Sequence, residues 1–297
     1  MAITKVAELG DTVPVIIEKA QLVSQFAAIM AGLVWNKDKR NRAGSTVNIP
    51  YFHEVAATVL TEGIDMTSSE TMEDTNVPIT LYEVGAKIIL TDNAIEDDQE
   101  EVRSVAGRIL GQAMEKKRDQ DLLAELDDAN TTLCGSANSL TMGHIAAAKA
   151  ILAGNDSIAP NRGPAPLPYV CVLHPFQTLD LVDVLTPVAG SASYATSFSD
   201  DIIKNYTIGR LFSMNVIEDG NMQYEVSGAA TSGMKGGVFA QGEGGAIVLA
   251  TARDWDIRPE RDESLRGWEL NCVGRYGVGE YNKYWIVELF TDAAVPA

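Results

Sequence analysis

Apolar and polar residues alternate over residues 76–84, where Val77, Ile79 and Leu81 are spaced two apart, and this period predicts a β-strand. After Thr91-Asp92-Asn93 the apolar spacing changes to three and four residues, which predicts one helix over residues 92–127. Such a helix contains about 36 residues and extends roughly 54 Å at about 1.5 Å per residue. A helix of this length is expected to cross a flat subunit or to bridge neighbouring subunits.

The start of this helix is marked by Asn93 and Glu96, which match a capping box, and by further acids that suit the positive end of the helix dipole. We interpret these acids as dipole partners rather than metal ligands. Lys116, Lys117 and Arg118 interrupt the apolar stripe, so the helix is expected to be at most half buried. The stripe consists of Ile95, Val102, Val105, Ala106, Ile109, Leu110 and Ala113, and it resumes at Leu122, Leu123 and Leu126.

The N-terminal part of the chain is predicted to contain an amphipathic helix over residues 14–35, with Pro14 in its first turn. A basic cluster follows, and a short strand over residues 46–51 comes next. The cluster is either a solvated linker or a contact surface. Its members are Lys37, Lys39, Arg40 and Arg42.

The chain has no lysine or arginine between Arg42 and Lys87, while acids, serines and threonines are frequent there. Little apolar pattern follows Leu60, although strand-like pieces stand on both sides. These properties predict an extended two-stranded loop that its own domain does not bury. The loop is either an ordinary flexible hairpin or an arm that lies on another subunit.

The second half of the chain alternates helix and strand before it becomes mainly β. A proline-rich linker near residues 160–168 marks a boundary, and a compact α/β unit is expected from about residue 167 to 252. Helices are predicted at 142–153, 175–185 and 200–205, and strands at 169–173, 211–217, 237–240, 255–259, 268–276 and 284–290.

The net charge of −18, from 23 basic and 41 acidic residues, argues against tight contact with a phosphate backbone. The three cysteines, Cys134, Cys171 and Cys272, are scattered and are expected to be free thiols. The first residues carry no apolar leader, and no apolar run reaches the roughly 20 residues that a membrane span needs. We therefore expect a soluble protein with no membrane contact.

The sequence offers little catalytic chemistry, and we predict no catalytic, cofactor-binding or metal-binding residue. Residues 228–235 fail as a phosphate loop, because Met234 separates Gly233 from Lys235. The three histidines, His53, His144 and His174, stand in no zinc or triad frame, so structural roles are expected for them.

The order of these parts resembles tailed-bacteriophage major capsid proteins of the Hong Kong 97 type. The resemblance rests on the strand Gly44-Ser45-Thr46-Val47-Asn48-Ile49-Pro50, the turn Leu60-Thr61-Glu62-Gly63, the return strand through Leu90-Thr91-Asp92, and the long helix. It continues through Lys116-Lys117-Arg118-Asp119-Gln120-Asp121, residues 170–177 with their His-Pro step, Gly209-Arg210-Leu211-Phe212, residues 258–260 and Tyr276-Gly277-Val278-Gly279. Each motif is weak alone, and the specificity lies in their order over nearly the whole chain.

The resemblance implies an α+β fold with five segments: an N-terminal arm (1–43), an extended loop (44–90), a peripheral domain with the spine helix (91–164), an axial domain (165–252) and closing peripheral strands (253–297). It also implies a virion shell protein, assembled in the host bacterial cytoplasm, whose copies form hexamers and pentamers around double-stranded DNA without sequence-specific binding. Because no long helical scaffolding region precedes the arm, scaffolding, if it is needed, is expected to come from a separate protein. Portal and decoration proteins are further candidate partners.

We hypothesise that the acidic loop contacts basic residues of a neighbouring subunit. Exposed ion pairs contribute only about 0 to 1 kcal/mol each, so apolar loop and arm residues must add cohesion. The candidate contact residues are Lys37, Lys39, Arg40, Glu62, Asp65, Glu70, Glu73, Asp74, Lys116, Lys117 and Arg118.

Two alternatives stay open at this point. An encapsulin-like shell has the same fold but encloses a protein cargo, and the long lysine-free loop and the N-terminal arm favour the viral interpretation over it. An α/β enzyme of the cytoplasm that uses carboxylate chemistry would instead form a small oligomer.

The lysine-free loop generates the first prediction. A lysine-to-asparagine crosslink that starts from this loop is chemically unavailable, so shells of this protein should contain no covalent oligomers. Denaturing gels of purified particles should show a single monomer band, and a ladder of covalent oligomers would contradict the prediction.

Overall fold

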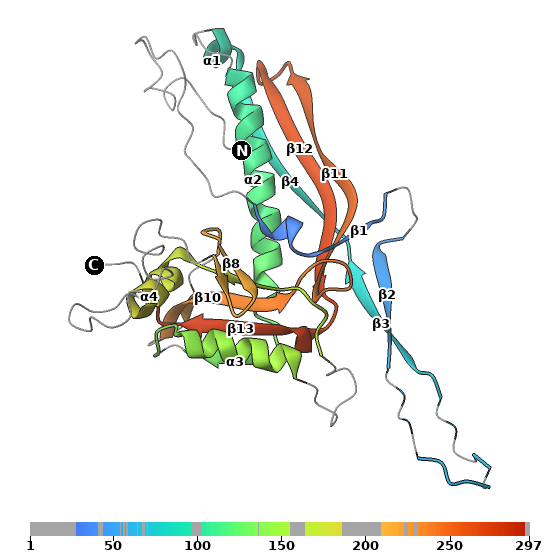
Figure 1. Cartoon of the computed structure of the whole chain (residues 1–297). Coiled ribbons are helices and arrows are strands. Elements are labelled where there is room, and N and C mark those ends of the chain that lie inside the picture. The colour runs from blue at the N-terminus through green and yellow to red at the C-terminus, as the bar shows by residue number, and fades with distance from the viewer. Residues whose placement is uncertain are drawn as a thin grey trace.

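The computed structural model describes residues 28–40, 44–53, 55, 57, 59–63, 65–66, 69, 71–96, 102–135, 137–154, 164–185, 209–222, 225–227 and 231–294. These residues form two sheets, a long helix that contacts both, and a two-stranded arm that projects from the body (Figure 1).

The first sheet, here called the long sheet, contains four of the described strands in the order β1 (Trp35–Asp38), β11 (Ile247–Asp262), β12 (Gly267–Glu280) and β4 (Tyr82–Thr91). Only the β1–β11 pair is parallel. Helix α2 (Val102–Ala124) lies along this sheet, and the short α1 (Asp92–Glu96) stands at its end (Figure 1). Leu110 and Met114 of α2 are buried against Leu90 and Leu270 of the sheet.

The second sheet, here called the wide sheet, contains seven described strands. The order is β5 (Thr131–Cys134), β13 (Ile286–Thr291), β10 (Thr231–Ala240), β6 (Tyr169–Leu173), β8 (Met214–Glu218) and β7 (Arg210–Leu211), and β9 (Glu225–Ser227) pairs with β10. Helices α3 (Met142–Ala153) and α4 (Pro175–Leu185) accompany this sheet (Figure 1). The main core forms here, and the C-terminal end of α2 enters it through Leu122 and Leu123, followed by Leu126 just after the helix.

Gln177 joins α4 to two strands of the wide sheet. Its side chain is fully buried, and its Nε2 donates to the carbonyls of Met234 and Leu289 at 3.0 Å each and to Thr291 Oγ1 at 2.9 Å. A buried amide must find partners, so these bonds fix the start of α4 over β10 and β13.

The arm consists of β2 (Thr46–Phe52), β3 (Asp74–Thr80) and the connection between them, residues 53–73. The two strands pair only with each other among the described strands. Figure 1 shows them leading away from the body. The predicted strand at 46–51 is confirmed, and a two-stranded arm is present. The predicted bounds of the loop, 44–90, are too wide, because residues 82–90 belong to β4 of the long sheet.

Several local predictions are confirmed, including α3, α4 and β6 at their predicted bounds. The return strand is also present, but Leu81 divides it into β3 and β4, and its N–H donates to the Ser45 carbonyl at 2.8 Å. The predicted helix at 200–205 lies outside the described residues.

The predicted helix at 14–35 is wrong in its described part. A 3-10 turn (Met30–Gly32) and strand β1 replace it. Periodicity alone could not reveal that Trp35–Asp38 adds to the edge of β11, because that pairing involves residues more than 200 positions away.

The long helix also differs from its prediction. Ala124 ends α2, residues 97–101 lie outside the described chain, and Ile109 of the predicted stripe is exposed. The N-cap is Thr91 rather than Asn93: the Thr91 hydroxyl accepts a hydrogen bond from the Ala94 N–H at 3.3 Å.

The strands do not follow the predicted segments in several places. Strand β1, from segment 1–43, and most of β4, from segment 44–90, pair in the long sheet with strands of segments 165–252 and 253–297. β5, from segment 91–164, and β13, from segment 253–297, both pair within the wide sheet, next to strands of segment 165–252. Strand β11 also runs without interruption across the predicted boundary at 252/253. Sheet membership depends on long-range pairing, which local patterns do not encode.

Close approach of the arm base to β12 generates a stability prediction. A Cβ added at Gly277 would overlap the Thr80 carbonyl at the end of β3, whereas a Cβ at Gly111 in α2 meets nothing within 4 Å. Gly277→Ala should therefore lower the free energy of unfolding by about 1 to 3 kcal/mol. Gly111→Ala, the control, should raise it by about 0.5 to 1 kcal/mol because alanine favours helix. Denaturant unfolding of unassembled subunits measures both, and equal effects would contradict the prediction.

Candidate interaction surfaces

The base of the arm is anchored to the body by apolar and aromatic contacts. Ile49 and Ile79 are buried against Val248 of the long sheet. The Tyr281 ring lies 5.3 Å from the Trp35 ring and 5.6 Å from the Tyr51 ring, measured between centroids. The Tyr281 hydroxyl also donates to the Pro50 carbonyl at 3.2 Å. The direction in which the arm leaves the body is therefore set within the chain.

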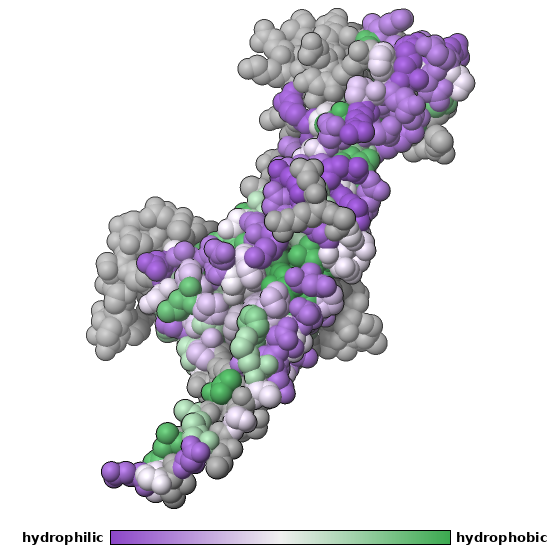
Figure 2. Space-filling view, turned by 90° about the vertical axis from the view of Figure 1, so that its right-hand side faces the viewer, coloured by the Kyte–Doolittle hydropathy of each residue, from purple (hydrophilic) through white to green (hydrophobic). Residues whose placement is uncertain are grey.

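The outer part of the arm exposes apolar side chains to solvent. The space-filling view shows hydrophobic colouring on the surface of the projecting arm, interspersed with hydrophilic colouring (Figure 2). Several large apolar side chains exposed on one projecting element indicate a contact surface. The exposed fractions are Phe52 56%, Val55 58%, Val59 100%, Leu60 62%, Met66 60% and Met72 73%.

The acidic candidates share this surface. Glu62, Asp65, Glu73 and Asp74 are exposed and form no ion pair with another described residue, while Glu70 lies outside the described chain. Their charges are therefore available to a partner, as the contact hypothesis requires.

The three basic candidates beside the arm already have partners within the chain. Lys37 Nζ lies 4.0 Å from the centroid of the Trp35 ring. The Lys39 ammonium donates to the Thr46 carbonyl. Arg40 pairs with Asp254 at 2.5 Å. Of these contacts, the Arg40–Asp254 pair joins the stretch before the arm to β11, and the Lys39 contact joins it to β2.

The three basic candidates on α2 have different surroundings. Lys116 is exposed and forms no ion pair with another described residue. Lys117 pairs with Asp121 at 2.5 Å, and the Arg118 guanidinium lies 4.4 Å from the centroid of the Trp255 ring. Lys116 is therefore the basic candidate on α2 whose charge is free for a neighbour.

Asp121 is a contact point that sequence reasoning missed. Besides Lys117, it accepts hydrogen bonds from the hydroxyls of Tyr82 at 3.0 Å and Tyr276 at 2.8 Å. Burial, together with this carboxylate, raises the pKa of both tyrosines, so they stay protonated and donate. The network fixes α2 to β4 and β12.

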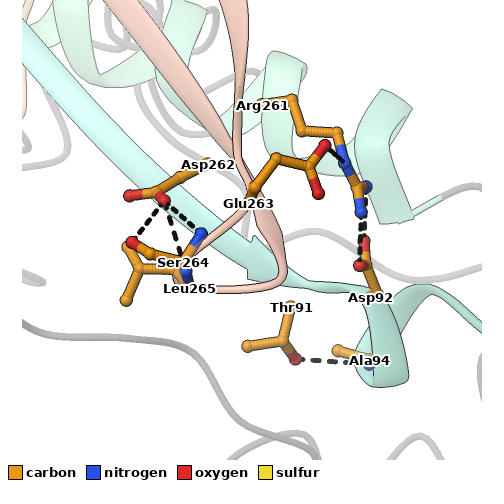
Figure 3. Close-up of polar contacts among 8 residues, drawn as sticks. All are labelled: Thr91, Asp92, Ala94, Arg261, Asp262, Glu263, Ser264 and Leu265. Carbon is orange, nitrogen blue, oxygen red and sulfur yellow. Dashed lines mark hydrogen bonds and ion pairs between the residues drawn. The ribbon is translucent and has the colours of Figure 1, made fainter.

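A second network closes the far end of the long sheet (Figure 3). Both terminal nitrogens of Arg261 bond the Asp92 carboxylate at 2.9 Å, and its Nε bonds Glu263 at 2.8 Å. Asp262 accepts hydrogen bonds from the Ser264 N–H and hydroxyl at 2.8 and 2.7 Å, which lowers its pKa. The sequence Asp262-Glu263-Ser264 signals the turn, but the Arg261–Asp92 pairing spans 169 positions and leaves no local signal.

Glu125, near the C-terminal end of α2, is a titratable group that no sequence motif marked. Burial, with the nearby carboxylates of Asp128, Glu280 and Asp121, raises its pKa to about 7. The group therefore titrates near neutral pH.

The histidines make local contacts. His144 takes part with Thr141 in the capping box of α3, His174 Nδ1 accepts from the Phe176 N–H at 3.2 Å, and His53 Nε2 lies 2.7 Å from Thr75 Oγ1. Among the described residues, no three His, Cys, Asp or Glu side chains are grouped to hold a metal ion, and no helix is long and apolar enough to cross a membrane.

A family model described as "Phage capsid protein" matches residues 74–287, which is more than half of the chain. The chain belongs to the phage capsid protein family. The match begins at β3 and ends within β13, so it covers most of both sheets and the long helix, while β1 and β2 precede it. No curated protein sequence matches the chain.

Solved capsid structures have the same fold. The capsid of Ralstonia phage GP4 matches with a TM-score of 0.72 at 12% identity, over 100% of this chain and 99% of that one. A structure from Mycobacterium phage Che8 matches with a TM-score of 0.69 at 20% identity, over 93% and 96%. The head of Helicobacter pylori bacteriophage KHP40 matches with a TM-score of 0.67 at 11% identity, over 99% and 98%. The predicted α+β capsid fold is confirmed.

The contrast between Lys116 and Lys117 generates a paired prediction. Lys116→Glu should leave the melting temperature of the subunit unchanged and should weaken assembly, because it places a negative charge where a neighbour's acids are expected. Lys117→Glu should lower subunit stability by up to about 1 kcal/mol, because it breaks an ion pair and repels Asp121. Thermal unfolding and particle sizing measure the two effects. Unchanged assembly of the Lys116→Glu protein would remove Lys116 from the contact surface.

Proposed function

We propose that this phage capsid family protein is the major shell subunit of a tailed-phage head and that its copies form hexamers and pentamers that enclose double-stranded DNA. Family membership supports a structural, non-enzymatic role and a place in the virion capsid. Self-assembly in many copies then follows from the role itself.

The observation that carries the proposal is the arm. A two-stranded ribbon is at best marginally stable in water, and this one exposes Val59 completely and Leu60 and Met72 by more than half. The base is nevertheless fixed to the body by the ring contacts of Tyr281. An arm that is aimed by its own subunit but not covered by it suits a neighbouring copy as its partner.

Net charge supports DNA as the content of the shell. A shell that is filled with DNA benefits from an inner surface that binds the phosphate backbone weakly. Each phosphate that a basic residue neutralises adds salt-dependent binding of the DNA to that surface. A charge of −18 per copy meets that requirement.

The five predicted segments enter the proposal as functional parts. They are the N-terminal arm 1–43, the extended loop 44–90, which contains the two-stranded arm of β2 and β3, the peripheral parts 91–164 and 253–297, and the axial part 165–252. We assign β5 and β13 to the axial part, since they pair in the wide sheet. Assembly in the host cytoplasm, with separate scaffolding, portal and decoration proteins, belongs to the same proposal.

The two alternatives are less well supported. An encapsulin-like shell shares the assembly but not the content, so staining of purified particles for DNA or for a protein cargo separates the two. Family membership favours a shell over a carboxylate enzyme, which would be a small oligomer.

Particle assembly after substitution of the exposed arm residues tests the proposal. The full chain should form megadalton particles or stable capsomers in sizing experiments. The triple variant Val59→Ser, Leu60→Ser and Met72→Ser should lose them, because it removes exposed apolar area that only a neighbour can bury.

The control variant carries Thr61→Ser and Thr71→Ser, which are exposed polar positions in the same loop, and it should assemble normally. The melting temperature of the unassembled subunit should be the same in all three proteins. Normal assembly of the triple variant, or only small oligomers of the unmodified chain, would contradict the proposal.

A further inference from the structure

One buried carboxylate joins three separate parts of the chain. Asp119 of α2 is fully buried. Its Oδ1 accepts a hydrogen bond from the Met30 N–H at 3.0 Å, and its Oδ2 accepts one from Asn221 Nδ2 at 2.9 Å. Met30 begins the turn before β1, and Asn221 follows β8 of the wide sheet. The long helix, the N-terminal segment and the wide sheet therefore meet at one side chain.

A second buried carboxyl group shares a hydrogen-bonding partner with the first. Asp219 is also fully buried, and its Oδ1 accepts from the Asn221 N–H at 2.8 Å. Its backbone N–H donates to the Leu173 carbonyl at 2.9 Å, which fixes it to β6. The two side chains share Asn221, whose backbone N–H donates to Asp219 and whose Nδ2 donates to Asp119, while Asp219 Oδ2 is buried and receives no donor from the described residues.

Two buried carboxyl groups that share one neutral partner are most stable when the pair holds a single proton. If both were ionised, two like charges would lie near Asn221 away from water, and an unpaired buried charge is strongly destabilising. A proton on Asp219 gives its Oδ2 a role as donor, while Asp119 accepts from the Met30 N–H and from Asn221 Nδ2.

No described cation compensates the pair. Lys116 of the same helix is exposed, and the Arg118 guanidinium faces the Trp255 ring. The turn at Met30 contributes only its N–H, and the loop after β8 contributes the neutral Asn221. His174, which follows Leu173 on β6, bonds the Phe176 N–H instead.

We propose that the Asp119–Asp219 pair is a proton-dependent latch. While the pair retains one proton, it holds the turn that begins at Met30 and the wide sheet to the long helix. When both groups ionise, this junction loosens. The latch acts within one chain, so its failure would leave the proposed shell function untouched.

The direction of the pH dependence follows from the Asp219 pKa. Burial, and then the hydrogen bond with Asp119, raise this pKa from 3.8 to about 7. A raised carboxyl pKa means that the folded state holds the proton more tightly, so the stabilisation is present at low pH and is lost as pH rises through about 7. The junction should therefore be closed at pH 6 and looser at pH 8.5.

Hydrogen exchange of the full-length protein tests the latch. Backbone amides of residues 29–34 should lose about tenfold in protection between pH 6 and pH 8.5 after correction for intrinsic exchange, since pH 6 lies about one unit below the pKa and each unit corresponds to a factor of ten. In Asp219→Asn the amide mimics the protonated acid, donating to Asp119 and accepting from Asn221, so the protection should become independent of pH.

Two further variants keep the outcome interpretable. Glu260→Gln, on the exposed part of β11, is the charge control and should keep the pH dependence of the unmodified chain.

Glu125→Gln removes the other carboxyl group with a pKa raised to about 7. If Asp219→Asn fails to fold, the infrared band of a protonated carboxylic acid in the Glu125→Gln protein decides the question. The band should be present at pH 6 and absent at pH 8.5. Protection at residues 29–34 that does not change with pH in the unmodified chain, an equal change in Asp219→Asn, or the absence of the band at pH 6 would overturn the proposal.

Discussion

The constraint on which the rest of the structure depends is that one helix packs into two hydrophobic cores. The first half of α2 buries Ala106, Leu110 and Met114 against the long sheet, and its end buries Leu122 and Leu123 in the core of the wide sheet. At 23 residues, α2 is about 35 Å long, more than one small core can cover. Helix α2 therefore holds the two sheets at a fixed distance, because it is packed into the core of each.

This arrangement also explains why polar contacts gather on α2. Asp121 bonds Tyr82 and Tyr276 of the long sheet, while Asp119 bonds Met30 and Asn221 on the other side. Apolar packing is not directional, so hydrogen bonds to these two carboxylates fix the rotation of the helix between its two sheets. The N-terminal segment that they hold leads through β1 to the base of the arm.

Local elements could be predicted from the sequence because their signals are local. The starts of α3 and α4 follow from Thr141, which precedes Met142, and from Pro175 in a first turn. The arm follows from its acidic, lysine-free composition. Long-range pairing could not be predicted in the same way. Neither the addition of Trp35–Asp38 to β11 nor the position of β13 in the wide sheet has a local pattern.

The candidate contact residues divide along the same line. The exposure of the loop acids follows from their composition, because no cation stands near them in the sequence. The internal partners of Lys37, Lys39, Arg40 and Lys117 could not be foreseen, because a surface lysine and a paired lysine look alike in a sequence. Among the basic candidates, only Lys116 has a side chain that forms no ion pair, hydrogen bond or ring contact with another described residue.

The central claim is that the arm completes its burial on another copy of the chain, and an image reconstruction of the assembled protein tests it most directly. The account predicts closed shells of hexamers and pentamers in which the arm residues Val59, Leu60 and Met72 are buried against a neighbouring subunit. Particles in which the arm extends into solvent and subunits meet only through their bodies would contradict it.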